Sequence, residues 1–193
     1  MLQVQNLNLK GRNTMKKIMV HILIVFSLFL IASCSDPDEE AEELIEYNND
    51  TWVPINKSKN EGISELTNEL YRLEDEEKEE EAVTVIEEEI IPILDDTHDK
   101  FKAVDLENNK VKKLNDLEVE AEELLLEKTK ELATHYKGGD VTEQNISQNN
   151  RKVAEKFQEV IDYRYELIKK YNLEYVEDDE SLGNLRNLKH KDE

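Results

Sequence analysis

The sequence predicts an all-α protein, an antiparallel bundle of about four helices. Only five glycines and three prolines occur among 193 residues, whereas glutamate, lysine and leucine, which favour helices, are common. Apolar residues recur three and four positions apart over long stretches, as they do along one face of a helix. The glycine pair Gly138-Gly139 interrupts this pattern most clearly and predicts the end of a helix.

Residues 15–33 have the layout of a secretory signal peptide. Lys16 and Lys17 precede an apolar run over 18–32, which is shorter than the ~20 residues that a membrane-spanning helix needs. Residues 1–14 are polar and fit no part of this leader. Because Lys10-Gly11-Arg12 could be encoded by a purine-rich ribosome-binding stretch, we expect translation to start at Met15 rather than Met1.

The leader ends in Ile31-Ala32-Ser33-Cys34, which resembles the lipobox of bacterial lipoproteins. The resemblance implies cleavage between Ser33 and Cys34, a diacylglycerol on the Cys34 sulfur, and attachment to the extracytoplasmic face of the cell membrane. Two acyl chains anchor a protein that one chain would bind only reversibly. Cys34 is the single cysteine, so an acylated chain would have no thiol for a disulfide or a zinc site. The alternative is an ordinary signal peptide beside an incidental cysteine.

The chain is strongly acidic, with a net charge of −21. Residues 1–33 hold four basic residues and no acidic ones, so the remainder has 21 basic against 46 acidic residues, a net charge of −25. Such a charge repels nucleic acid, anionic lipid and wall polymers. We therefore expect no nucleic-acid partner; the charge suits a basic partner or simple solubility.

Residues 34–43 are predicted to be the lipidated cysteine and an acidic tether, and residues 44–176 the helical domain. The first helix candidate covers 39–75, where Pro54 should bend or break the helix. A charged stretch at 74–81 is expected to be a loop or a frayed helix start.

Three further helices are predicted, at 83–104, at 110–136, and from Asp140 to about 171 or 176. Pro92 should kink the first of these. Asp140 and Glu143 resemble a capping box at the start of the last. The tail, 177–193, is expected to be flexible or to form a short helix through Leu182, Leu185 and Leu188.

One cluster could bind a cation. On a helix Asp95 and Asp99 share a face, and His98 lies beside one of them. Ferritin-like bundles place such a carboxylate–histidine pair on two helices, but here the spacing is right on one helix only. We therefore predict no metal site and keep Asp95, His98 and Asp99 as weak candidates.

The sequence gives no support for catalysis. It contains no Gly-x-Ser-x-Gly motif and no glycine-rich phosphate loop, and the anchor accounts for Cys34. Carboxylate pairs carry no information in so acidic a chain. We expect no enzyme and no cofactor.

Three aromatic residues are weak candidates for interaction. Trp52, the single tryptophan, is either an exposed stacking residue or a core anchor next to Pro54. Tyr163 and Tyr165 lie on opposite sides of a helix among basic residues and could belong to a local ligand surface.

The architecture, an anchor followed by a helical domain, resembles that of small helical lipoproteins of Gram-positive bacteria, including a family described as cell-wall-binding lipoproteins, and the resemblance assigns no functional residue to this chain. This similarity rests on the lipobox followed by an acidic helical domain. It implies a membrane-anchored interaction or scaffold protein, whose partner is another envelope protein and which presents an exposed apolar patch. The alternative is a small-ligand or cation-binding surface lipoprotein, with a pocket between helices for which the region of Pro92 and His98 is a candidate.

Overall fold

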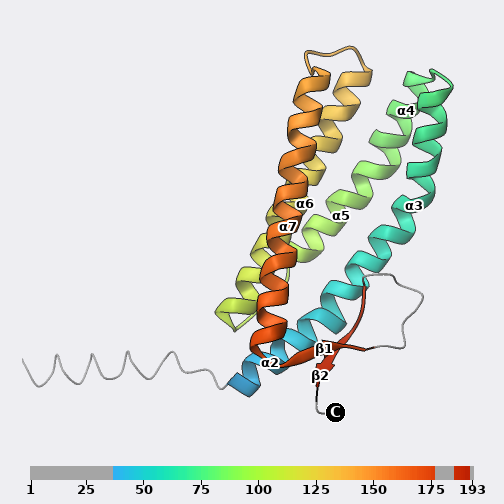
Figure 1. The fold of residues 1–193 in the computed structure, drawn as a ribbon. Helices are drawn as coiled ribbons and strands as arrows, with labels where there is room; N and C mark the ends of the chain where they lie inside the picture. The colour runs from blue at the N-terminus through green and yellow to red at the C-terminus, as the bar shows by residue number, and fades with distance from the viewer. Residues whose placement is uncertain (1–36, 177–184, 192–193) are drawn as a thin grey trace, which may run out of the picture. The chain divides into compact units, whose positions relative to one another are not determined.

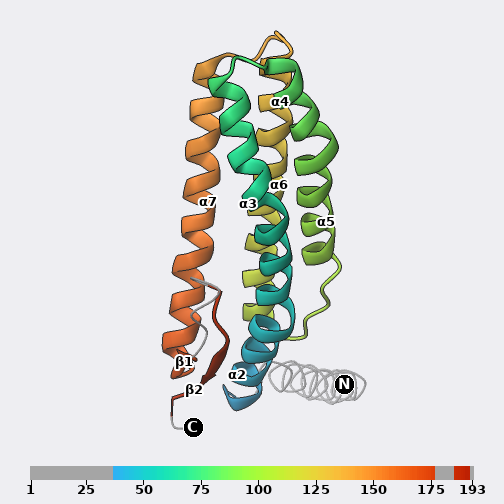
Figure 2. The ribbon, with the colours of Figure 1, turned by 90° about the vertical axis from the view of Figure 1, so that its right-hand side faces the viewer.

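The computed structural model describes residues 37–176 and 185–191, which form an antiparallel bundle of four long helical segments (Figure 1). The predicted all-α bundle is thus confirmed. Figure 2 shows α6 behind α3, with α7 on one side and α5 on the other. The leader, Ser33 and Cys34 lie outside the described residues. None of the helices in the described part is long and apolar enough to span a membrane.

The first segment consists of α2 (Pro37–Glu46), the π-helical turn η1 (Tyr47–Trp52) and α3 (Val53–Asp75). The second consists of α4 (Glu79–Val85), the π-helical turn η2 (Ile86–Ile90) and α5 (Ile91–Lys102). The third is α6 (Asn109–Tyr136) and the fourth is α7 (Glu143–Lys170). In the charged stretch 74–81, predicted to be a loop or a frayed helix start, only residues 76–78 lie outside a helix, and α4 begins at Glu79.

Two of the three prolines, Pro54 and Pro92, lie in helices that follow a π-helical turn. Pro54 is the second residue of α3 and Pro92 the second residue of α5. Proline has no N–H, and its ring collides with the carbonyl four residues earlier in a regular α-helix. Here the chain widens instead, and Val53 N–H donates to the carbonyl of Asn48, five residues back. Of the two outcomes predicted for Pro54, a bend or a break, the break does not occur, because the extra residue in the turn accommodates the ring.

The connection between α6 and α7 has the predicted glycine stop but a different cap. Gly138 has φ +70°, which glycine adopts without strain. Thr142, not Asp140, caps α7: its hydroxyl accepts from Asn145 N–H, and the Asn145 side chain accepts from Thr142 N–H. The capping box expected from Asp140 and Glu143 is thus wrong by two residues, and the Thr142–Asn145 pair satisfies the same orphan N–H groups.

The ends of the domain also differ from prediction. Residues 37–43, expected in a tether, form the first turns of α2, because Pro37 fits the first position of a helix and acidic residues follow it. In the tail, β2 (Leu188–His190) pairs antiparallel with β1 (Leu173–Tyr175). The predicted short helix is therefore wrong at Leu188, which is buried in a strand; Leu182 lies outside the described residues.

The core consists of two apolar clusters. The first joins α2, the N-terminal half of α6, the C-terminal half of α7 and both strands. It includes Leu44, Leu114, Leu167 and Leu188. The second joins α3, α4, η2, α5 and the C-terminal half of α6. Along α6 the first cluster ends at Ala121 and the second begins at Leu126. Two buried glutamates, Glu118 and Glu122, lie near this boundary.

Candidate ligand-binding site

Arg164 on α7 is the centre of a buried polar network. Its side chain is only 6% exposed, and its Nη2 donates to Glu118 Oε1 over 2.9 Å. Its Nη1 donates to Asn48 Oδ1 over 2.8 Å. The guanidinium carbon lies 3.5 Å from the centroid of the Trp52 ring, a cation–π contact. Trp52 Nε1 in turn donates to Glu118 Oε1. The network therefore ties α7, α6 and η1 together.

The π-helical turn η1 supplies two side chains that contact Arg164 and one that binds β2. Asn48 and Trp52 contact Arg164 directly. Asn48 Nδ2 also donates to the carbonyl of Arg186 over 3.0 Å. Next to it, Asn49 accepts from Leu188 N–H over 2.7 Å and donates to the Leu188 carbonyl over 3.0 Å. The same turn thus binds the arginine and holds both the backbone of Arg186 and the first residue of β2.

The electrostatics of the network depend on two buried carboxylates. Burial raises the pKa of Glu118 above its ordinary value, and the Arg164 guanidinium acts in the opposite direction. One helical turn further on, Glu122 Oε1 lies 2.5 Å from Lys59 Nζ. Its second oxygen, Oε2, is the buried side-chain atom in the described residues that has no hydrogen-bond partner. Each buried carboxylate is therefore paired with a cation of its own.

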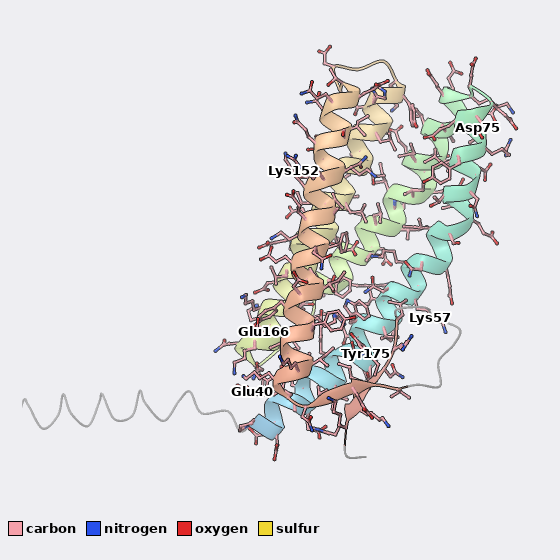
Figure 3. The ribbon with its side chains drawn as sticks, in the orientation of Figure 1. Glu40, Lys57, Asp75, Lys152, Glu166 and Tyr175 are labelled. Atoms are coloured by element: carbon pink, nitrogen blue, oxygen red, sulfur yellow. The ribbon has the colours of Figure 1, made fainter. Side chains whose placement is uncertain are left out.

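A cavity of about 420 Å³ opens beside this network. Its lining comes from η1, α3, α6, α7, β1 and the residues just before β2: Trp52, Asn56, Glu118, Phe157, Val160, Ile161, Arg164, Tyr165, Tyr175 and Arg186. Tyr175 lies in the half of the bundle that holds α2 and the strands (Figure 3), and its ring meets that of Tyr165 edge to face at 6.4 Å.

The rim of the cavity carries unusual apolar exposure. Among the described residues, the large apolar side chains that are exposed are Tyr71, Ile161 and Tyr165, and the last two line this cavity. Apolar walls with a few convergent polar groups are typical of small-molecule sites. The arrangement can hold an apolar group against α7 and orient a polar group toward Arg164 and Glu118.

The structure does not gather Asp95, His98 and Asp99 into a metal-binding group. His98 Nδ1 lies 3.5 Å from Asp99 Oδ1, and Asp99 is 73% exposed. Within the described residues, no set of three or more His, Cys, Asp or Glu side chains is placed to hold a metal ion. The described cavity beside Trp52 and Arg164 is not lined by Pro92 or His98.

The three aromatic candidates have different positions. Trp52 is half-buried, packs against the first apolar cluster and also lines the cavity, so it combines features of both predicted roles. Tyr165 is 57% exposed and lines the cavity. Tyr163 lies outside that cavity, under Lys113, whose Nζ is 4.2 Å from the ring centroid. The sequence thus identified two of the residues around the site.

Sequence reasoning missed Glu118, Asn48 and Arg186, and it considered Arg164 only as one of the basic residues beside Tyr163 and Tyr165. One signal was present: Leu114, Glu118 and Glu122 are spaced four apart, so two glutamates continue an apolar stripe of α6. Carboxylates on a core-facing stripe need partners, and Arg164 and Lys59 are those partners.

Comparison of the chain with family models, curated proteins and solved structures finds no match.

Proposed function

We propose that this chain is a lipid-anchored extracytoplasmic binding protein, whose bundle takes a small ligand in the cavity beside Trp52 and Arg164. The observation that carries the proposal is the cavity itself, in which aromatic walls meet a buried Arg164–Glu118 pair. Of the two hypotheses from the sequence, this one agrees better with the surface. A scaffold protein would need a broad apolar face, and two of the three exposed large apolar residues in the described region belong to the cavity.

The lipid anchor is proposed on the sequence Ile31-Ala32-Ser33-Cys34. α2 begins at Pro37, three residues after Cys34. A chain of three residues reaches at most about 10 Å, so an acylated Cys34 would keep the start of α2 close to the membrane. The domain would then take its ligand at the extracytoplasmic face of the cell membrane.

The proposed role is binding without catalysis. Arg164 and Glu118 are engaged with each other and with Trp52 and Asn48. The described lining residues of the cavity include no serine, threonine, cysteine or histidine. Such a lining supports recognition of a ligand by shape and charge.

The anchor is tested by expressing the full chain in a bacterium that is fed labelled palmitate. We expect label on the wild type, and a Cys34→Ala variant that is unlabelled and leaves the membrane fraction. Equal labelling of both forms would refute the anchor.

The cavity is tested on the full chain in detergent, by screening a small-molecule library with the fluorescence of Trp52, the single tryptophan. We expect at least one saturable ligand whose binding is weakened by Tyr165→Ala and not by Tyr71→Ala, the matched exposed tyrosine. Ligands that ignore the Tyr165 substitution would argue against this cavity.

A further inference from the structure

We infer that the cavity selects a ring that carries hydroxyl groups, with the side-chain oxygens of Asn56 and Glu118 accepting from those hydroxyls. This inference rests on the proposed binding function and names the chemistry of its ligand. Two classes of compound carry that chemistry, a phenolic ring and a sugar ring.

Two side-chain oxygens on the cavity wall accept from no group in the described residues. Glu118 binds both Trp52 and Arg164 through Oε1, which leaves Oε2 without a donor. Asn56 donates from Nδ2 to the carbonyl of Trp52 over 3.0 Å, and its Oδ1 has no donor either. Both residues line the cavity. Because an acceptor that loses water without gaining a partner is costly, a ligand that covers these oxygens has to bring donors of its own.

Both oxygens are open to the cavity rather than enclosed in the core. In the described part of the chain, Glu122 Oε2 is the buried side-chain atom with no hydrogen-bond partner, and neither Glu118 Oε2 nor Asn56 Oδ1 is enclosed in this way. Glu118 and Asn56 are only 2% and 7% exposed, so what surface they have belongs to the wall that they line. Trp52 binds both side chains, Glu118 through its indole and Asn56 through its carbonyl. The two acceptors are thus gathered around one residue.

The remaining walls favour a ring on the ligand. Ile161 and Tyr165 lie one turn apart on α7 and are 44% and 57% exposed. Phe157 and Tyr175 line the same cavity, and Tyr175 meets Tyr165 edge to face. A ring that packs against these side chains covers apolar surface, which is favourable. A ring with hydroxyl groups at its edge offers an apolar face and donors together, and the volume of about 420 Å³ suits a small molecule.

The test uses the full chain in detergent and follows the indole N–H resonance of Trp52, the single tryptophan, by NMR. The first probes are catechol, phenol and 1,2-dimethoxybenzene, which share one ring and carry two, one and no hydroxyl groups. We expect catechol to shift the resonance saturably and to bind at least about tenfold more tightly than 1,2-dimethoxybenzene, with phenol between them. The fourth probe is methyl α-glucopyranoside: tighter binding than that of catechol would identify a sugar ring, and weaker binding a phenolic ring.

Two matched asparagine variants locate the donors. Asn56→Ala removes one acceptor and should reduce the affinity for catechol to about that for phenol, in a protein whose thermal unfolding confirms that it is folded. Asn149→Ala is the control and should change nothing, since Asn149 is a half-buried asparagine of α7 that donates to Glu131 and lies outside the cavity lining.

Three results would overturn the inference: equal binding of catechol and 1,2-dimethoxybenzene, no binding of any probe, or wild-type affinity for catechol in Asn56→Ala. A library ligand that has no O–H or N–H group and is weakened by Tyr165→Ala would keep the proposed function and still end the assignment of a hydroxylated ring.

Discussion

The two π-helical turns, η1 and η2, solve the same backbone problem and serve different ends. Each directly precedes an α-helix with proline at its second position. In η2 the turn carries Ile86 and Ile90 into an apolar cluster. In η1 it carries Asn48 and Trp52 to Arg164. π-Helical turns are frequent at functional sites, and this pair teaches that the turn alone does not make one. The site at η1 is made by the side chains that the turn presents, Asn48 and Trp52, together with the cation of Arg164 that lies opposite them.

Replacing Arg164, the cation opposite η1, should have the largest effect on the free energy of unfolding. Arg164→Met leaves Glu118 buried without its charge partner and Asn48 Oδ1 without its donor. Loss of one partner of a buried pair costs about 3–5 kcal/mol, and we expect a decrease of that size in the free energy of unfolding, measured with urea. Arg151→Met, at a pair exposed on α7, is the control and should leave the midpoint unchanged. An Arg164→Met protein as stable as wild type would show that the network is not structural.

Truncating Ile86 in η2 should lower the free energy of unfolding somewhat less than Arg164→Met does, and it should leave the candidate site intact. Ile86 is fully buried in η2, and Ile86→Ala should lower the free energy of unfolding by about 3 kcal/mol through the cavity it leaves. The Trp52 emission of the folded variant should match that of wild type, since Ile86 belongs to the other apolar cluster. A change in that emission would mean that the two turns are coupled through the core.

Asn49 should have a smaller and more local effect. Its side chain makes two hydrogen bonds with the backbone of Leu188, so Asn49→Ala should cost about 1–2 kcal/mol. The amide of Leu188 should exchange with solvent at least about tenfold faster, while amides in the second apolar cluster keep their rates. Uniform acceleration across the domain would contradict a local role for Asn49 in holding β2.

A carboxylate at the start of the first segment provides a contrast with Glu118. Hydrogen bonds from Lys110 and Tyr171 hold the pKa of Glu40 well below its ordinary value. A lowered pKa in the folded state adds stability above the unfolded-state value, and this stability is lost as the pH falls through and below 4.5. Glu40→Gln should therefore flatten the acid limb of a stability–pH curve by about 1 kcal/mol, given its partly exposed partners. An unchanged limb would assign the acid sensitivity to other carboxylates.

The sequence was sufficient for the helices and insufficient for the site. The spacing of apolar residues and the placement of the glycines predicted α6 and α7, because both features are local patterns in the chain. The site joins residues that are far apart in the chain, such as Asn48 and Arg164, separated by 116 positions. The tail was misjudged for the same reason, since Leu188 pairs with Tyr175 in the other strand and is also held by the side chain of Asn49, 139 positions away. Local spacing carries no information on such pairs.

Replacing the prolines that follow η1 and η2 should change the free energy of unfolding least, and these two substitutions test the turns most directly. Replacing a proline inside a regular helix by alanine removes a penalty of about 3 kcal/mol. In η1 and η2 the extra residue already accommodates the ring, and Val53 and Ile91 donate to carbonyls five residues back. Pro54→Ala and Pro92→Ala should each change the free energy of unfolding by less than about 1 kcal/mol.

Closing either turn to a regular helix would rotate all side chains on one side of it by about 100°. In η1 that rotation would break the contacts of Asn48 or Trp52 with Arg164, and in η2 it would expose Ile86 or Ile90. The tertiary contacts should therefore keep both turns open after the proline is gone. Trp52 emission checks this for Pro54→Ala, and urea midpoints for both variants. A gain near 3 kcal/mol in either variant would mean that the proline, and not the packing, holds that turn open.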